Sequence, residues 1–151
     1  MGIDQDIHQS KFRSEHQKAS VNLLYTYGWI TERTRELFAS EDITPQQFNI
    51  LRILRGSHPQ PLSTLQIRER MLDKMSDTSR IVDRLITKGL VKKGTCKADR
   101  RLVDVMITDK GKKMLERLDE RQDELDSIIG NLTAKEAATL SELLDKIRGS
   151  E

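Results

Sequence analysis

The chain has 151 residues, of which 33% are charged and only 4% are aromatic, and its formal net charge is +2. This profile is typical of one soluble, largely helical domain whose surface mixes both signs of charge. No apolar run approaches the roughly 20 residues of a membrane span, and the single cysteine excludes an internal disulfide. The charged N-terminus has no apolar signal segment, so we expect a cytoplasmic protein without membrane contact.

Positive charge is concentrated in one part of the sequence. Residues 60–115 contain 14 Lys and Arg against 7 Asp and Glu, whereas the rest of the chain contains 12 against 17. A basic surface of this kind neutralises the phosphates of a nucleic acid. A solvated basic surface without a ligand explains the asymmetry equally well, so the charge needs support from motifs.

A long helix is predicted over residues 10–39, where apolar side chains such as Leu23 and Tyr27 recur near helical spacing. Tyr25 and Trp29 lie on or beside that stripe. Aromatic side chains in such positions are expected in a core or at a dimer contact more often than around a ligand.

Two capping boxes mark the starts of short helices further along the chain. Thr44 with Gln47 forms the first, and Pro45 suits the first helical position. Ser63 with Gln66 forms the second, and its helix is predicted to run to about residue 71.

The most informative helix is predicted from about Ser76 to Lys88. Its apolar face comprises Thr78, Ile81, Val82, Leu85 and Ile86, and its opposite face comprises Ser76, Arg80, Asp83, Arg84 and Thr87. Gly89 supplies a left-handed stop. A helix with a small polar and Arg-bearing outer face suits the major groove of DNA, where its N-terminal half approaches base edges.

A β-hairpin is predicted directly after this helix, with strands over residues 90–95 and 102–108. The connection over residues 96–101 carries three basic side chains, which can reach the narrow and more negative minor groove. Helix and hairpin together predict a winged helix-turn-helix, and therefore a transcription regulator.

Two further helices are predicted after the hairpin, one over residues 109–129 and one that begins at the capping box of Thr133 and Glu136. The apolar stripes of these two helices and of the first helix exceed what a small winged helix needs for its own core. A two-fold dimer that holds two reading helices about one DNA turn apart would use them. The alternative is a helical cap that folds back on its own monomer.

The order of elements and the residues together resemble the multiple antibiotic resistance regulator (MarR) family. The resemblance is carried by Ser76-Asp-Thr-Ser-Arg80-Ile-Val-Asp-Arg84-Leu, Lys88-Gly89-Leu90-Val91, Asp99-Arg100-Arg101 and Ile107-Thr108-x-x-Gly111. It implies a mainly α fold with a small β wing, in a single domain over residues 1–151. The winged helix-turn-helix reader would span about residues 44–111, flanked by dimerisation helices over about residues 10–39 and 112–148.

The resemblance also implies a homodimer that binds double-stranded DNA at a short palindromic operator. Members of the family usually repress, and often release DNA when a small phenolic or other lipophilic inducer binds. Carried over residue by residue, the major-groove contacts would be Ser76, Asp77, Ser79 and Arg80. Arg84 would hold the DNA backbone or pair with Asp83 or Asp104.

The wing contacts carried over in the same way are Lys97, Asp99, Arg100 and Arg101. Arg101 would enter the minor groove, with Asp99 orienting it through a charge-assisted pair. Arg100 and Lys97 would meet phosphate.

Cys96 beside the wing departs from the redox-sensing members of the family, which keep a cysteine near the start of the first helix. Its basic neighbours Lys92, Lys93 and Lys97 could make it reactive. An ordinary strand-end cysteine is the favoured interpretation.

Metal binding, cofactor binding and catalysis find no support in the sequence. His8, His16 and His58 lack the paired spacing that a metal site requires. No GxSxG, P-loop, HExxH or CxxC motif is present, so we expect neither a cofactor nor an enzyme.

Two questions remain open at the level of sequence. Tyr25, Trp29, Phe48 and Met71 could line an inducer cleft near the junction of the dimer helices and the reader, or simply pack in the core. The alternative function is a winged-helix protein-interaction module without a specific operator, although such a module has no need of the Arg80, Arg100 and Arg101 set.

Overall fold

Three helices form the centre of the lower half of the computed structural model, which describes residues 2–95 and 103–149. They are α3 (Pro45–Ser57), α4 (Thr64–Arg70) and α5 (Thr78–Thr87). Both predicted capping boxes are present. The Thr44 hydroxyl accepts a hydrogen bond from the Gln47 amide, and the Ser63 hydroxyl accepts one from the Gln66 amide, each at 3.1 Å. In each box the glutamine side chain also accepts a hydrogen bond from the backbone amide of the N-cap residue. The local sequence therefore defines where α3 and α4 begin.

A three-stranded antiparallel sheet completes this half, in the order β1 (Leu62–Ser63), β3 (Val103–Ile107), β2 (Val91–Thr95). Leu62 lies opposite Val105, and Val91 lies opposite Ile107. The two wing strands were predicted from their alternation. The strand β1 was not, because two residues carry no periodic signal and pair only once β3 is in place. The mainly α fold with a small β wing is confirmed.

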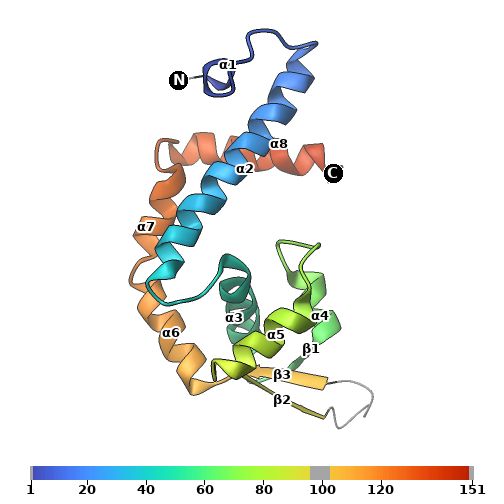
Figure 1. Cartoon of the computed structure of the whole chain (residues 1–151), viewed down its shortest axis with the longest axis vertical. Helices are drawn as coiled ribbons and strands as arrows, with labels where there is room; N and C mark the ends of the chain where they lie inside the picture. Colours follow the sequence, from blue (N-terminus) through green and yellow to red (C-terminus); the bar gives the residue numbers. More distant parts are fainter. Residues whose placement is uncertain (1, 96–102, 150–151) are drawn as a thin grey trace.

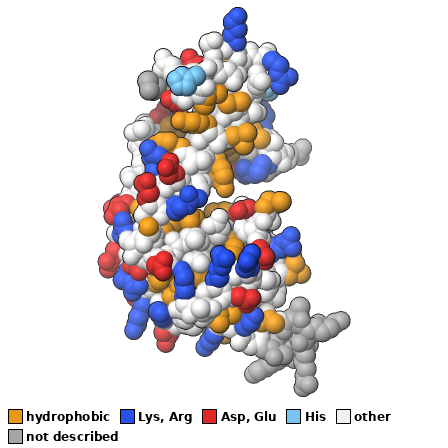
Figure 2. Space-filling model, in the orientation of Figure 1, with side chains coloured by type: hydrophobic (Ala, Val, Ile, Leu, Met, Phe, Trp, Pro, Cys, Tyr) orange, Lys and Arg blue, Asp and Glu red, His pale blue; other side chains and the backbone are white. Residues whose placement is uncertain are grey.

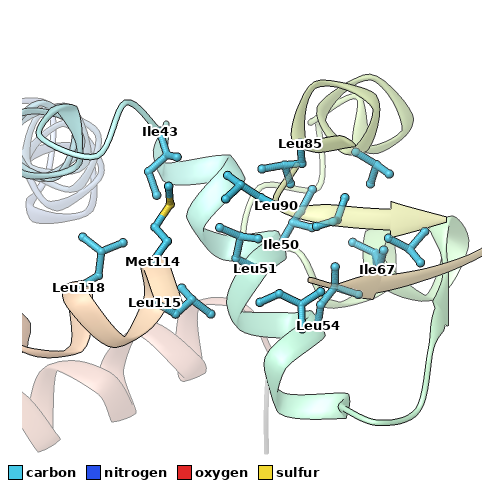
Figure 3. Packing of buried hydrophobic residues seen from close by; sticks show 14 of the residues in the cluster. Ile43, Ile50, Leu51, Leu54, Ile67, Leu85, Leu90, Met114, Leu115 and Leu118 are labelled. Carbon is cyan, nitrogen blue, oxygen red and sulfur yellow. The ribbon is translucent and has the colours of Figure 1, made fainter. Parts of the chain in front are cut away.

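One hydrophobic core joins these elements. Figure 3 shows Leu51 and Leu54 of α3 pointing toward residues of the sheet and of α5. Leu115 approaches α3 from α6 (Asp109–Asp119), the helix that follows β3. Leu51 and Leu115 are fully buried, as is Leu85 of α5. The winged half is therefore a packed unit that holds α5 rigidly. We call the residues from α3 to β3 the reading head.

The long N-terminal helix α2 (Glu15–Ala39) begins five residues later than predicted. Ser14 is its N-cap, with the side-chain hydroxyl accepting from the Gln17 amide at 3.1 Å. The residues before it instead include a short helix, α1 (Ile3–Asp6). The prediction of a start at residue 10 was wrong because Ser14 satisfies the exposed amides of the first turn, and so defines the boundary.

The prediction of a single helix over residues 109–129 was also wrong. The structure divides it into α6 (Asp109–Asp119), α7 (Gln122–Asp126) and the 3₁₀ turn η1 (Ser127–Ile129). The break follows two carboxylates, Asp119 and Glu120, which are unfavourable at the negative end of a helix. Side-chain bonds of Arg121 to α2 then hold the turn.

The last helix, α8 (Ala134–Ile147), begins at the predicted capping box. In Figure 1, α2 rises away from the reading head, α7 lies beside its lower end, and α8 crosses it. We call α2, α7, η1 and α8 the arm. None of the helices in the described residues is long and apolar enough to cross a membrane.

Candidate nucleic-acid interface

The first turn of α5 presents most of the predicted major-groove residues. One face of α5 is buried against the rest of the reading head, through Thr78, Val82 and Leu85. The opposite face leaves Ser79, Arg80 and Arg84 exposed. The amphipathic pattern thus orients the helix as the sequence predicted. The exposed side chains are the ones available to base edges and phosphates.

Asp77 has a structural role that competes with its predicted base contact, whereas Ser76 has none among the described residues. Asp77 is the N-cap of α5, and its carboxylate accepts a hydrogen bond from the Arg80 amide at 3.2 Å. Ser76 is half-buried, and its hydroxyl oxygen has no hydrogen-bond partner within the described chain. Asp77 therefore fixes the start of the helix, so any contact of its carboxylate with a base would be additional to this bond.

The C-terminal end of α5 is also held firmly. Gly89 has φ of +76°, and the Leu90 amide donates to the Leu85 carbonyl at 3.0 Å, which completes the predicted stop. Lys88 donates to the Gln47 side chain at 3.1 Å, and Lys110 donates to the Lys88 carbonyl at 2.9 Å. Sequence reasoning missed these two lysines, although cations near the end of a helix are a known signal.

Asp83 forms an ion pair with Lys93 of β2, at 2.9 Å. It is therefore not the partner of Arg84 in this structure, which was one of the alternatives for that residue. The pair joins the exposed edge of α5 to the strand β2 of the wing.

An open groove of about 440 Å³ lies between α4 and the start of α5. It is lined by Thr64, Leu65, Arg68, Met75, Ser76, Asp77, Thr78 and Ser79. Ser76, Asp77 and Ser79 were predicted from the sequence, whereas Thr64 and Arg68 of α4 were not. The groove gathers hydroxyls and a guanidinium on one surface, which are common partners of DNA phosphates.

The wing tip lies outside the described residues. Cys96, Lys97, Asp99, Arg100 and Arg101 all fall there, so their predicted roles stay predictions. The strand β2 that leads to the tip carries exposed Lys92 and Lys93, which extends the basic surface in that direction.

A second, smaller cavity of about 180 Å³ lies between the arm and the reading head. It is lined by Tyr27, Ile30, Thr31, Thr34, Pro45, Gln46, Asn49, Met71, Leu72 and Asp73. Met71 is the one member of the predicted inducer cleft that lines it.

The other three cleft candidates lie in different environments. Trp29 is covered by the guanidinium of Arg33, 3.6 Å from its ring centroid, and Tyr25 is exposed one helical turn away. Phe48 is half-buried and packs against the core residue Phe38, with the ring centroids 4.3 Å apart and the rings tilted by 33°. The residue types and spacing in α2 did not show which of its faces packs against the reading head.

Groups of three or more side chains able to hold a metal ion are absent from residues 2–95 and 103–149. The described histidines include His58, which lies against an amine: its Nε2 is 2.9 Å from the Lys112 Nζ.

Comparisons with known proteins agree with this geometry. A family model described as MarR family matches residues 41–102. The multiple antibiotic resistance protein MarR of Salmonella typhimurium is 32% identical over 108 residues, covering 70% of this chain and 74% of that protein.

Solved structures extend the similarity to nearly the whole chain. A MarR transcription factor from Planctomyces limnophilus is 34% identical with a TM-score of 0.68, covering 89% of this chain and 98% of that one. A mutant MarR from Escherichia coli complexed with operator DNA is 26% identical with a TM-score of 0.81, covering 91% and 99% respectively.

Proposed function

Because this chain belongs to the MarR family of DNA-binding transcription regulators, we propose that it is a homodimeric repressor of a palindromic operator. The observation that carries the proposal is the rigidly held α5, whose exposed face presents Ser79, Arg80 and Arg84 beside a basic wing. The E. coli relative was crystallised with operator DNA, and this supports the same partner for the present chain. Ser76 and Asp77 at the start of α5 complete the proposed major-groove set. From the wing, Arg101 would enter the minor groove, with Asp99 orienting it and with Lys97 and Arg100 on phosphate.

The homodimer is supported by apolar side chains that the arm leaves uncovered. Of the 25 residues of α2, all of them described, only Leu37 and Phe38 are buried. The described helix α8 buries none of its residues, although Leu143 and Ile147 are apolar. Figure 2 shows hydrophobic side chains gathered over the upper half of the molecule, where the arm lies. An apolar surface of this kind is a typical interaction site, and a second copy of the same arm is the occupant that we propose.

The division of labour within the single domain follows from this arrangement. Residues 44–111 would read DNA, and the helices over residues 10–39 and 112–148 would dimerise. Each subunit would place α5 in one major groove, so that two half-sites lie about one helical turn apart.

Release by a small inducer is the least developed part of the proposal. The cavity between α2 and the reading head is lined by Tyr27, Ile30 and Met71, an apolar and aromatic set suited to a compact phenolic or lipophilic ligand. A ligand that entered there would push the arm and the reading head apart. Both heads could then no longer meet their half-sites at once.

The alternative is a winged-helix module for protein contact without a specific operator. Exposed arginines on α5 favour DNA, since a protein-contact module has no general need of them. Selection of random duplexes by the purified protein at near-physiological salt separates the two. Recovery of a palindrome with half-sites about one turn apart supports the dimeric regulator. Recovery of no sequence, with only weak and salt-sensitive binding, supports a non-specific DNA binder or the protein-contact module.

Arg80→Ala is expected to weaken binding to the recovered operator by about 1–3 kcal/mol and to relax specificity at one position of each half-site. Arg80 lies on the exposed face of α5, and removing a guanidinium there deletes a donor pair to a base edge. Fluorescence anisotropy against the operator and single-position variants measures both effects. Arg52→Ala, which removes an exposed guanidinium from α3 rather than from α5 or the arm, is the matched control. Equal affinity and equal specificity of the Arg80 variant and the control would refute the contact.

A further inference from the structure

Three arginines hold α6 between the end of α2 and the reading head: Arg121 and Arg117 bind the end of α2 and the turn after it, and Arg55 binds α6 to α3. We call this set the junction cluster: Arg55, Arg117 and Arg121 with their partners Glu41, Asp119 and Glu124. Each arginine makes two hydrogen bonds to one carboxylate, the strongest common geometry for such a pair. None of these residues lies on α5, and none lines the cavity beneath α2.

Arg121 lies at the break between α6 and α7 and binds the end of α2. One guanidinium nitrogen donates to the Leu37 carbonyl at 3.2 Å and to the Ser40 hydroxyl. The other two nitrogens donate to Glu124 at 3.2 and 2.8 Å. The Leu37 carbonyl is among the last four of α2, which have no partner within the helix. Arg121 therefore caps α2 with a charge of the favourable sign.

Arg117 and Arg55 hold α6 on its two sides. Arg117 binds Glu41, in the turn after α2, at 3.0 and 2.9 Å. Arg55 of α3 binds Asp119, at the end of α6, at 2.7 and 3.1 Å. Hydrogen bonds from these arginines lower the pKa of Glu41 and of Asp119, so both carboxylates are charged at neutral pH.

These bonds connect the arm and the reading head through one short helix. On α6, Arg117 binds Glu41 in the turn after α2, and Asp119 binds Arg55 of the reading head. The apolar contact between arm and head is small, since α2 buries only Leu37 and Phe38 among its described residues. The hydrophobic effect itself has no preferred direction, whereas paired hydrogen bonds are directional and therefore favour one angle.

We propose that the junction cluster sets the angle between arm and reading head, and through it the half-site spacing that the protein accepts, with Arg121 as the main positioning residue. The inference rests on the proposed dimeric function. The arm amplifies small changes at the junction: 25 residues give α2 a length of about 37 Å. A rotation of ~5° then moves its far end by ~3 Å, close to the rise of one base pair.

The test uses duplexes with two identical half-sites whose separation changes in steps of one base pair. Wild-type protein is expected to prefer one separation. Arg121→Met and Arg117→Met should keep their affinity for a single half-site but lose about three- to tenfold of that preference, the loss expected when charge-assisted bonds are removed. Arg121→Lys, which keeps the charge without the paired geometry, should recover only part of it.

Lys113→Met is the matched control, because it removes one positive charge from an exposed position on the same helix. It should retain the wild-type spacing profile. Circular dichroism checks folding, and Glu41→Gln replaces any arginine variant that fails to fold.

Two negative outcomes are distinguishable. Wild-type spacing profiles in the arginine variants and in Glu41→Gln would overturn the positioning role while leaving the dimeric regulator intact. No spacing preference in the wild type would refute the proposed dimeric operator, and this inference with it.

Discussion

Leu143→Glu is expected to convert the protein to a monomer and to reduce operator affinity by about 10²- to 10⁴-fold. Leu143 lies on α8 with 54% of its surface exposed, and that helix buries none of its described residues. A charge there would be desolvated in a dimer but would remain in water in a monomer. The second half-site would then be bound independently, without the effective concentration that a linked partner provides.

Size-exclusion chromatography with light scattering gives the oligomeric state, and anisotropy against the full operator gives the affinity. Ser141→Glu is the matched control, because it adds the same charge to an exposed position about 200° around the same helix. It should remain dimeric. A Leu143→Glu protein that is dimeric with wild-type affinity would exclude this face of α8 from the interface.

Gly111→Ala is expected to lower the free energy of unfolding by about 1–3 kcal/mol, the cost of inserting atoms into a packed interior. A Cβ at this position would lie 2.3 Å from the Leu90 carbonyl oxygen and 2.7 Å from a side-chain carbon of Ile107. Both neighbours belong to the base of the wing, and the backbone oxygen cannot move without shifting the end of α5. Operator affinity should therefore fall together with stability.

Gly56→Ala provides the comparison for this second substitution. Gly56 lies in α3, and a Cβ there would meet no atom within 4 Å. Because alanine favours helix by up to about 1 kcal/mol over glycine, this variant should be as stable as the wild type or more so. Urea denaturation followed by circular dichroism measures both variants, and equal midpoints for the two would contradict the steric argument.

The fold could be predicted correctly from the sequence because the motifs that indicate it are local, and several of them agree. Capping boxes at Thr44 and Ser63, the amphipathic pattern of α5 and the stop at Gly89 each depend on residues within one helical turn of one another. Gly111 was visible only as part of a motif, and the structure adds the reason: the Leu90 carbonyl leaves no room for a side chain.

The placement of some candidate site residues could be predicted from neighbouring positions in the sequence, whereas that of others depends on tertiary packing. The exposure of Arg80 and Arg84 follows from helical periodicity, and so was accessible from the sequence, whereas Ser79 came from the family resemblance. The capping role of Asp77 competes with its predicted base contact and is visible only once the helix start is known. Tyr25, Trp29 and Phe48 were grouped with Met71 by residue type, but the packing angle of α2 separates them.

Spacing along the chain was enough to predict most helices, the two wing strands and the polar face of α5. The strand β1, the break at Arg121 and the junction cluster depend on how distant segments pack together. Glu41 and Arg117 are 76 residues apart, and Arg55 and Asp119 are 64 apart. No periodicity links such positions. Their pairing depends on how the core orients α2, α3 and α6, and that orientation comes from long-range packing of buried side chains.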